Sequence, residues 1–255
     1  MLFRSQLEAL TIHFELSTPN RDVEGQLTHT PIIAPITLPN LRHFVFHGVS
    51  SYLEALVYRI TSPRLKKLQI QLLSQLTFFV PRLLQLINTA EDLRFHRANL
   101  FLIDKKVKVA IYPHGDGNIE MYAFAIEVSC WHLDWQVSSM VQISNSLNQV
   151  FSAVEHLDLV HEVHGRSSEE HNEVDRAEWR RLLRPFSNVK TFRIVEGLVQ
   201  ELSRCLRLED GELPLEVLPE LQELIYSGSG DTGDRFTPFI DARLNAGRPV
   251  KLVRR

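Results

Sequence analysis

Four histidines and three glutamates gather in one polar stretch of the chain and could together bind a metal ion. They are His156, His161, His164, His171, Glu162, Glu169 and Glu170. The spacing His161-x-x-His164 can place two imidazoles on one cation. A catalytic metal, however, requires ligands held on rigid, supported elements, whereas this stretch is acidic and poor in large apolar residues. We therefore expect solvated loop histidines, and a metal-binding protein that uses this loop remains the less favoured alternative.

Two glycine-containing motifs near residue 230 match enzyme motifs only in part. Asp231-Thr232-Gly233 is the triplet of aspartic proteases, but the sequence lacks the second copy that completes a carboxylate dyad. Gly228, Gly230 and Gly233 have the spacing of a dinucleotide-binding loop, but no second strand with an acidic ribose partner follows. We expect a turn and a helix start here, no cofactor and no enzymatic activity.

Cysteine content and charge narrow the class of protein further. Cys130 and Cys205 both have apolar neighbours, which favours buried thiols in a reducing compartment. The net charge is −3, from 28 basic and 31 acidic residues, which is too balanced for a general nucleic-acid or membrane-surface binder. The sequence has no signal-peptide core and no apolar run long enough to span a membrane. These features predict a cytoplasmic or nuclear protein with neither nucleic acid nor membrane as partner.

A pattern of apolar residues, L-x-x-L-x-(L/I/F), predicts the elements that position these side chains. It recurs as Leu7-Leu10-Ile12, Leu41-Phe44-Phe46, Leu65-Leu68-Ile70, Leu93-His96-Ala98, Met121-Phe124-Ile126, Val154-Leu157-Leu159, Val189-Phe192-Ile194 and Leu221-Leu224-Tyr226. Successive units start 24 to 35 residues apart, which is the period of solenoid repeats. Alternation within each unit predicts a short strand, and residues with helical spacing follow most units.

These units predict a single domain over residues 1–255, in the α/β class. We expect a degenerate leucine-rich-repeat solenoid with parallel strands on its concave face, helices outside, and a last strand near residue 226. Alternating runs around Asp116-Gly117 predict an inserted antiparallel hairpin near 100–120. Exposed loops are expected at about 17–37 and 161–176. No unit carries the asparagine that usually bonds neighbouring coils, so we expect mainly apolar packing to hold the units together.

Three helix boundaries can be predicted from capping residues and proline. Ser50 or Ser51 is expected to cap the helix after the second unit. Pro81 lies within an apolar run and predicts a kink or two short helices. Glu173 or Asp175 is expected to open the helix that contains Trp179.

Several segments resemble the C-terminal region of basidiomycete F-box proteins. They include TLPNLRHFVFHG, TSPRLKKLQIQLL, FSAVEHLDLVHEVH and the W-x-x-L-L-x-P-F-x-N-V segment at Trp179–Val189, and the likeness covers about residues 5–253. Members of that family carry an N-terminal F-box that binds the adaptor of a cullin-based ubiquitin ligase. The resemblance implies a substrate-recognition region that binds an unknown protein, with the adaptor as a partner only if an upstream F-box exists.

The first repeat starts without a preceding cap or F-box, so we expect an N-terminally truncated chain. A solenoid unit buries its core only against its neighbours, which makes end caps necessary. A structural or non-functional remnant that lacks its N-terminal cap is therefore the alternative to a binding module.

The residues between the apolar positions of each strand should project onto the concave face. This predicts a partner-binding surface, with a merely solvated sheet face as the alternative. Phe95 is the expected anchor, because a large exposed aromatic suits an interface, and the alternative for this residue is burial under the inserted hairpin. The candidates are His43, His47, Lys67, Gln69, Gln71, Phe95, Arg97, Glu127, His156, Asp158 and Arg193.

Overall fold

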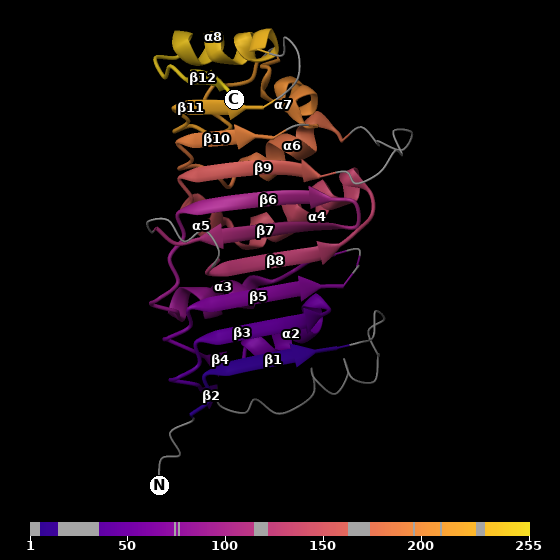
Figure 1. Ribbon diagram of the computed structural model, residues 1–255, viewed down its shortest axis with the longest axis vertical. Coiled ribbons are helices and arrows are strands. Elements are labelled where there is room, and N and C mark those ends of the chain that lie inside the picture. Colours follow the sequence, from indigo (N-terminus) through magenta and orange to yellow (C-terminus); the bar gives the residue numbers. More distant parts are fainter. Residues whose placement is uncertain are drawn as a thin grey trace.

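A ten-stranded sheet dominates the computed structural model, which describes residues 6–14, 36–73, 75, 77–114, 122–162, 174–195, 197–209, 211–227 and 233–255. The strand order is β1-β3-β5-β8-β7-β6-β9-β10-β11-β12, and β2 and β4 form a separate small sheet. The strands stack along the long axis of the molecule from the N-terminal to the C-terminal end (Figure 1). The chain therefore has a mixed α/β fold with a large, mostly parallel sheet.

The element boundaries are as follows. The strands are β1 (Ala9–His13), β2 (Ile36–Thr37), β3 (His43–Gly48), β4 (Ile60–Thr61), β5 (Lys67–Leu72), β6 (Arg97–Ile103), β7 (Lys106–Tyr112), β8 (Phe124–Ser129), β9 (His156–Glu162), β10 (Thr191–Ile194), β11 (Glu223–Tyr226) and β12 (Lys251–Arg254). The helices are α2 (Ser50–Val57), α3 (Pro81–Thr89), α4 (Leu133–Ser146), α5 (Asn148–Ser152), α6 (Arg176–Leu183), α7 (Val199–Leu206), η1 (Gly233–Phe236) and α8 (Thr237–Asn245).

Helices cover one face of the large sheet, and the apolar core lies between the two layers. Helices α2 to α7 lie behind the strands, and α8 lies at the C-terminal end of the stack (Figure 1). On β5, Leu68 and Ile70 point toward the helices and are completely buried, whereas the alternate residues Lys67 and Gln69 are only half-buried. Strand alternation thus gives the sheet one apolar and one polar face.

The polar face, called the open face below, is covered by no described helix (Figure 1). Neighbouring strands place its side chains in rows, because each pair keeps the same register. Its polar residues include Thr11, His13, His43, His47, Lys67, Gln69, Gln71, Arg97, Asn99, Lys106, Lys108, Glu127, His156, Asp158, Thr191, Arg193, Glu223 and Lys251.

The middle of the sheet contains the predicted inserted strands. β8 pairs with β5 and β6 pairs with β9, both in parallel, and β7 fills the gap between them antiparallel to both neighbours. Figure 1 shows the arrow of β7 running against those of the surrounding strands. The tight turn between β6 and β7 is at Asp104 and Lys105, whereas the predicted Asp116-Gly117 turn lies outside the described residues. The predicted antiparallel insertion near 100–120 is therefore confirmed at β7.

The fourth unit lies two residues later than its sequence pattern predicts. The pattern Leu93-His96-Ala98 was aligned with the later units, but in the sheet Ala98 pairs with Leu157 and Leu100 pairs with Leu159. A shift of two residues keeps every side chain on the same face of a strand. Alternation alone therefore cannot detect this error. The shift does change which of the residues before the strand takes the inward position of the unit.

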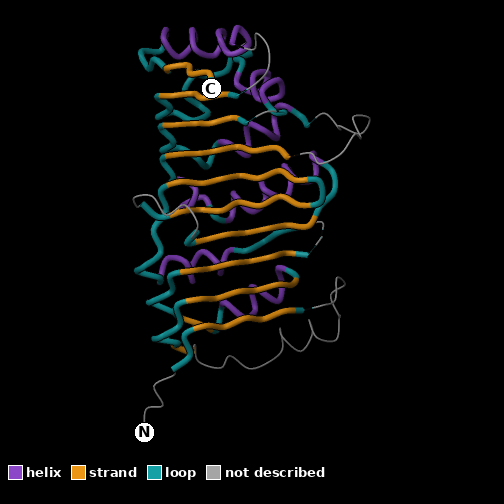
Figure 2. Tube along the Cα trace, viewed as in Figure 1, coloured by secondary structure: helices purple, strands orange, loops and turns teal. Residues whose placement is uncertain are grey.

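Main-chain hydrogen bonds connect the starts of neighbouring strands. The carbonyl of His96 accepts from the amides of Glu155 (2.8 Å) and His156 (3.2 Å), and the carbonyl of Glu155 accepts from those of Lys190 (2.8 Å) and Thr191 (3.2 Å). The carbonyls of Glu8, Arg42 and Lys190 accept equivalent pairs of bonds. This strand-start ladder runs along the left edge of the sheet in Figure 2. These main-chain bonds connect the units although no unit carries the usual asparagine. The expectation that mainly apolar packing holds the units together was therefore incomplete.

The helix starts agree with the predictions only in part. Helix α2 begins at Ser50, but its N-cap is Val49, which makes no side-chain capping bond; the Gln75 Oε1 accepts from the Ser50 amide at 3.3 Å instead. Pro81 does not kink a helix; it is the first residue of α3, where its missing N–H costs no bond. Asp175 does cap α6, since its carboxylate accepts from the Ala177 amide at 3.0 Å.

Ordered elements extend into both predicted loops. β2 occupies residues 36–37, β9 continues through 162, and α6 begins at 176, while 17–35 and 163–173 lie outside the described residues. β12 lies beyond the expected last strand and pairs in parallel with β11. Within the described part of the chain, no helix has the length and apolarity needed to cross a membrane.

Candidate functional site

All the predicted partner-binding residues except Phe95 lie on the open face. Gln69 on β5 and Asp158 on β9 belong to one row that crosses the sheet through β8, β7 and β6. Arg193 on β10 continues this row beyond Asp158. The adjacent rows contain the remaining residues, which are His43, His47, Lys67, Gln71, Arg97, Glu127 and His156. The sheet therefore brings together side chains from six strands, and their role in binding stays a prediction.

The structure contradicts the assignment of Phe95 to this face. The Phe95 ring packs against the core, and its centroid lies 6.4 Å from that of the fully buried Phe124. Phe95 precedes β6 and takes the first inward position of the shifted fourth unit, three residues before Ala98. It stabilises the apolar layer and is no surface anchor.

A cluster of charged and amide groups surrounds Asp158 near the middle of the open face. Asp158 is only 8% exposed, and its carboxylate accepts a 2.6 Å hydrogen bond from the Arg97 guanidinium. Asn99 and Arg193 flank it in the same row. The buried Nε atoms of both arginines and the Asn99 Oδ1 have no hydrogen-bond partner within the described residues. The cluster therefore has unused hydrogen-bonding capacity.

A second cluster of the open face centres on Tyr122. The ammonium groups of Lys67 and Lys108 lie 4.6 Å and 5.0 Å from its ring centroid, which is the geometry of cation–π contacts. Its hydroxyl donates to Gln69 Oε1 at 2.6 Å, and burial raises the pKa of this hydroxyl. The phenol is therefore a neutral donor at neutral pH. No described carboxylate forms an ion pair with either lysine.

The open face is more basic than the chain as a whole. Its described charged side chains comprise six cations and three carboxylates, a difference of +3, against −3 for the full sequence. The cations are Lys67, Arg97, Lys106, Lys108, Arg193 and Lys251, and the carboxylates are Glu127, Asp158 and Glu223. This distribution favours an acidic partner.

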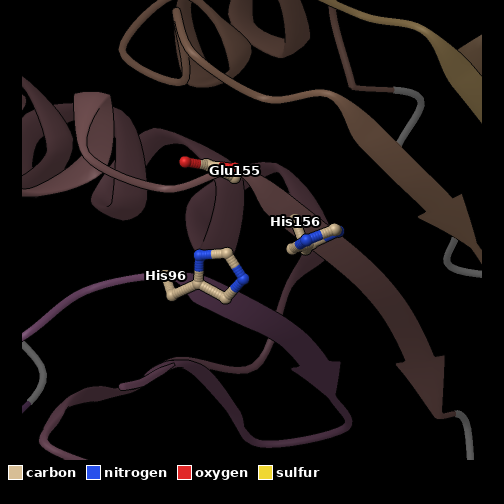
Figure 3. A group of neighbouring side chains, drawn as sticks. All are labelled: His96, Glu155 and His156. Atoms are coloured by element: carbon tan, nitrogen blue, oxygen red, sulfur yellow. The ribbon is translucent and has the colours of Figure 1, made fainter. Parts of the chain in front are cut away.

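A histidine cluster lies at the starts of β6 and β9. Ligand atoms of His96, Glu155 and His156 all lie within 4.8 Å of one another, and Figure 3 shows the three side chains side by side. The His96 ring contacts two further imidazoles, with centroid distances of 4.8 Å to His156 and 4.4 Å to His114. The strand-start ladder holds the backbone of this cluster, because the His96 carbonyl binds the amides of Glu155 and His156.

The electrostatics of this cluster keep His96 neutral and Glu155 ionised. Burial lowers the pKa of His96, and the neighbouring His156 and His114 lower it further. The Lys190 ammonium, which donates to the Glu155 carboxylate at 2.7 Å, lowers the pKa of that carboxyl group. At neutral pH the cluster thus offers an imidazole lone pair beside a carboxylate, and both are metal ligands.

The predicted histidine-rich loop is only partly described. His156 and His161 belong to β9, where His161 lies beside Gly197, whereas His164, His171, Glu169 and Glu170 lie outside the described residues. Sequence reasoning missed the pairing of His156 with His96 because it assigned His96 to an inward position. Glu155 is the second residue of the unit that starts at Val154. An alignment of His96 with Glu155 would have revealed that His96 and His156 are neighbours.

The other predicted chemical groups do not form a described site. Cys130 and Cys205 are free and buried, as expected, and burial raises the thiol pKa values to about 11 and about 12. Both thiols are therefore protonated at neutral pH. Residues 228–232, which hold most of the protease-like and dinucleotide-like motifs, lie outside the described residues.

Comparison with known proteins yields no relative: no protein-family model, curated protein or solved structure matches this chain. The resemblance to F-box proteins consequently stays a prediction.

Proposed function

We propose that this protein is a protein-binding module of the degenerate leucine-rich-repeat type, whose open face binds an acidic segment of a partner protein. The observation that carries the proposal is the basic face of the large sheet, which no described helix covers. A sheet face whose described charged side chains are mostly basic suits an acidic polypeptide better than a neutral or basic one.

Three features support the solenoid part of the proposal. Successive strands follow one another along the sheet from β1 through β3 to β5 and from β9 to β12, whereas β8, β7 and β6 lie between them in reverse chain order. The helices lie on one side, and each unit buries its apolar residues against its neighbours. The strand-start ladder repeats the same main-chain bonds from unit to unit. Repeated nearest-neighbour contacts of this kind are typical of a solenoid and support this part of the proposal.

The Tyr122 cluster is the best candidate for the centre of the interface. Tyrosine is enriched among residues that dominate binding energy, because it combines a large apolar ring with a polar hydroxyl. Lys67 and Lys108 on either side could each pair with a carboxylate of the partner without first breaking an ion pair within the described residues. The Asp158 cluster lies further along the same face and would contact a longer partner segment.

The resemblance to F-box proteins extends this proposal to a biological role. By that resemblance the bound protein is a substrate for ubiquitin transfer in the cytoplasm or nucleus. The cullin-ligase adaptor is a partner only in a chain that carries an F-box.

Charge reversal on the open face tests the binding role. A fluorescein-labelled poly-glutamate peptide is the probe, and fluorescence anisotropy measures its dissociation constant. We expect Lys67→Glu combined with Lys108→Glu to weaken binding by about tenfold or more, because two attractive contacts become repulsive.

The matched control is Arg64→Glu combined with Arg94→Glu, which makes the same charge change at exposed loop residues that precede β5 and β6. We expect this control to change binding by less than about twofold in 150 mM salt, since screening limits remote charges. Equal losses in both double variants would show general electrostatic attraction and would contradict the proposal.

A further inference from the structure

We propose that His96, Glu155 and His156 form a binding site for a divalent transition-metal ion of the zinc type. The three side chains come from two neighbouring strand starts and offer two imidazoles and one carboxylate (Figure 3). This donor set is one that zinc uses with a fourth position left for water or another ligand. The inference is independent of the proposed protein-binding role.

The geometry needs only small side-chain movements to hold an ion. The ligand atoms lie within 4.8 Å of one another, while ligands at zinc bond lengths in a tetrahedral site are roughly 3.4 Å apart. Rotations about the side-chain bonds can close this difference. The backbone need not move, because the His96 carbonyl already binds the amides of both Glu155 and His156.

Two neighbours support the ligands from outside. Lys190 donates to one Glu155 oxygen at 2.7 Å and leaves the other oxygen for the ion. The His114 ring stands at 90° to the His96 ring, with centroids 4.4 Å apart, and restricts its orientation. Hydrogen bonds and contacts that orient ligands commonly raise metal affinity 10- to 100-fold.

The sheet also contains a natural control for this site. His13 and His47 form a second imidazole pair, with ring centroids 4.1 Å apart. Among the described residues, the only group of three or more potential ligands that could hold an ion is the one at His96. The pair at His13 and His47 therefore matches the imidazole content of the proposed site without its carboxylate.

Zinc titration of the full chain tests the site. The metal-free protein is titrated with ZnCl2 by isothermal titration calorimetry in a non-chelating buffer. We expect one site per chain whose affinity falls at least about tenfold in His96→Ala and in His156→Asn, and severalfold in Glu155→Gln, because each change removes one ligand. The double variant His13→Ala with His47→Ala should bind zinc as the wild type does.

Thermal unfolding without zinc shows whether each variant is folded. All three ligand side chains are partly exposed and the ladder bonds are main-chain bonds, so the metal-free melting temperatures should stay close to that of the wild type. If His96→Ala is misfolded, Glu155→Gln decides, since it keeps the size of the side chain. Zinc affinity that is unchanged in the ligand variants, or absent in the wild type, would overturn the proposal.

Discussion

The two faces of the large sheet use the same strands for different purposes. On β5, the helix-side residues Leu68, Ile70 and Leu72 are completely buried and join one continuous core. The open-face residues between them are polar and half-buried, and contact neighbouring strands through single side-chain interactions. This difference indicates that the helix side determines stability, whereas the open face can vary its side chains to suit a partner.

The polar interactions of the two sides also differ in burial. On the open face, the side chains of the Lys251–Glu223 pair are 73% and 32% exposed. On the helix side, Arg243 is fully buried and Arg180 is 5% exposed. Exposed ion pairs contribute little because water screens them, but a buried guanidinium must keep all its partners. Substitutions of equal size should therefore have very different effects on the two sides.

Loss of an aromatic side chain from the core should have the largest effect. Phe124→Ala removes a completely buried ring that contacts Phe95, and we expect the free energy of unfolding to fall by about 3–5 kcal/mol. Urea unfolding measures this change. Gln69→Ala, on the directly paired strand β5 but on the open face, should lower it by less than about 1 kcal/mol. Similar losses would contradict the division between the faces.

Removal of the buried arginine should have the next largest effect. The Arg243 guanidinium donates to four main-chain carbonyls, those of Pro214, Leu218, Pro219 and Leu221. Arg243→Met removes all these bonds, and only the Leu218 carbonyl keeps another described donor, the Leu221 amide at 3.1 Å. We therefore expect a loss of about 3 kcal/mol in urea unfolding. The control Arg248→Met removes a side chain that is 56% exposed and should cost less than about 1 kcal/mol.

Acid should weaken the helix side through Glu212, by less than either core substitution. The Arg176 guanidinium lowers the pKa of Glu212 to about 2 from its ordinary 4.5. Because the folded-state pKa is the lower one, the stabilisation is present above pH 4.5 and is lost as the pH falls toward 2. Urea unfolding at pH 7, 4.5 and 3 should show a shallower decline for Glu212→Gln. Parallel pH curves for variant and wild type would refute this.

The exposed open-face pair should have the smallest effect. Lys251→Ala breaks the contact with Glu223 at 3.1 Å, and we expect the free energy of unfolding to change by less than about 0.5 kcal/mol. Differential scanning calorimetry can detect a larger shift. A loss above about 1 kcal/mol would mean that open-face ion pairs contribute to the fold as strongly as helix-side ones.

The sequence predicted the faces of the strands well because alternation is a local property. Lys67, Gln69 and Gln71 lie where the period of two places them. The position of Phe95 was wrong because the two-residue shift of the fourth unit leaves the alternation unchanged and is determined by pairing with β9. A side-chain cap at Ser50 was equally wrong, since the chain enters α2 through Val49.

Features that depend on contacts between distant units could not be predicted. The strand-start ladder uses main-chain carbonyls and leaves no residue pattern. The neighbourhood of His96 and His156 arises because β7 and β8 return toward β5 and leave β6 beside β9. Their 60-residue separation in sequence hides this contact from any local pattern.

Site-specific photo-crosslinking tests the central claim, that the open face is the binding surface, most directly. A photoreactive phenylalanine analogue is placed at Gln71 on the open face or at the exposed Arg181 on the helix side, and the full chain is irradiated in a lysate of its own organism. We expect one acidic protein to be captured from Gln71, lost when Lys67→Glu and Lys108→Glu are added, and not captured from Arg181. Equal capture from Arg181, or capture that is insensitive to these charge reversals, would contradict the claim.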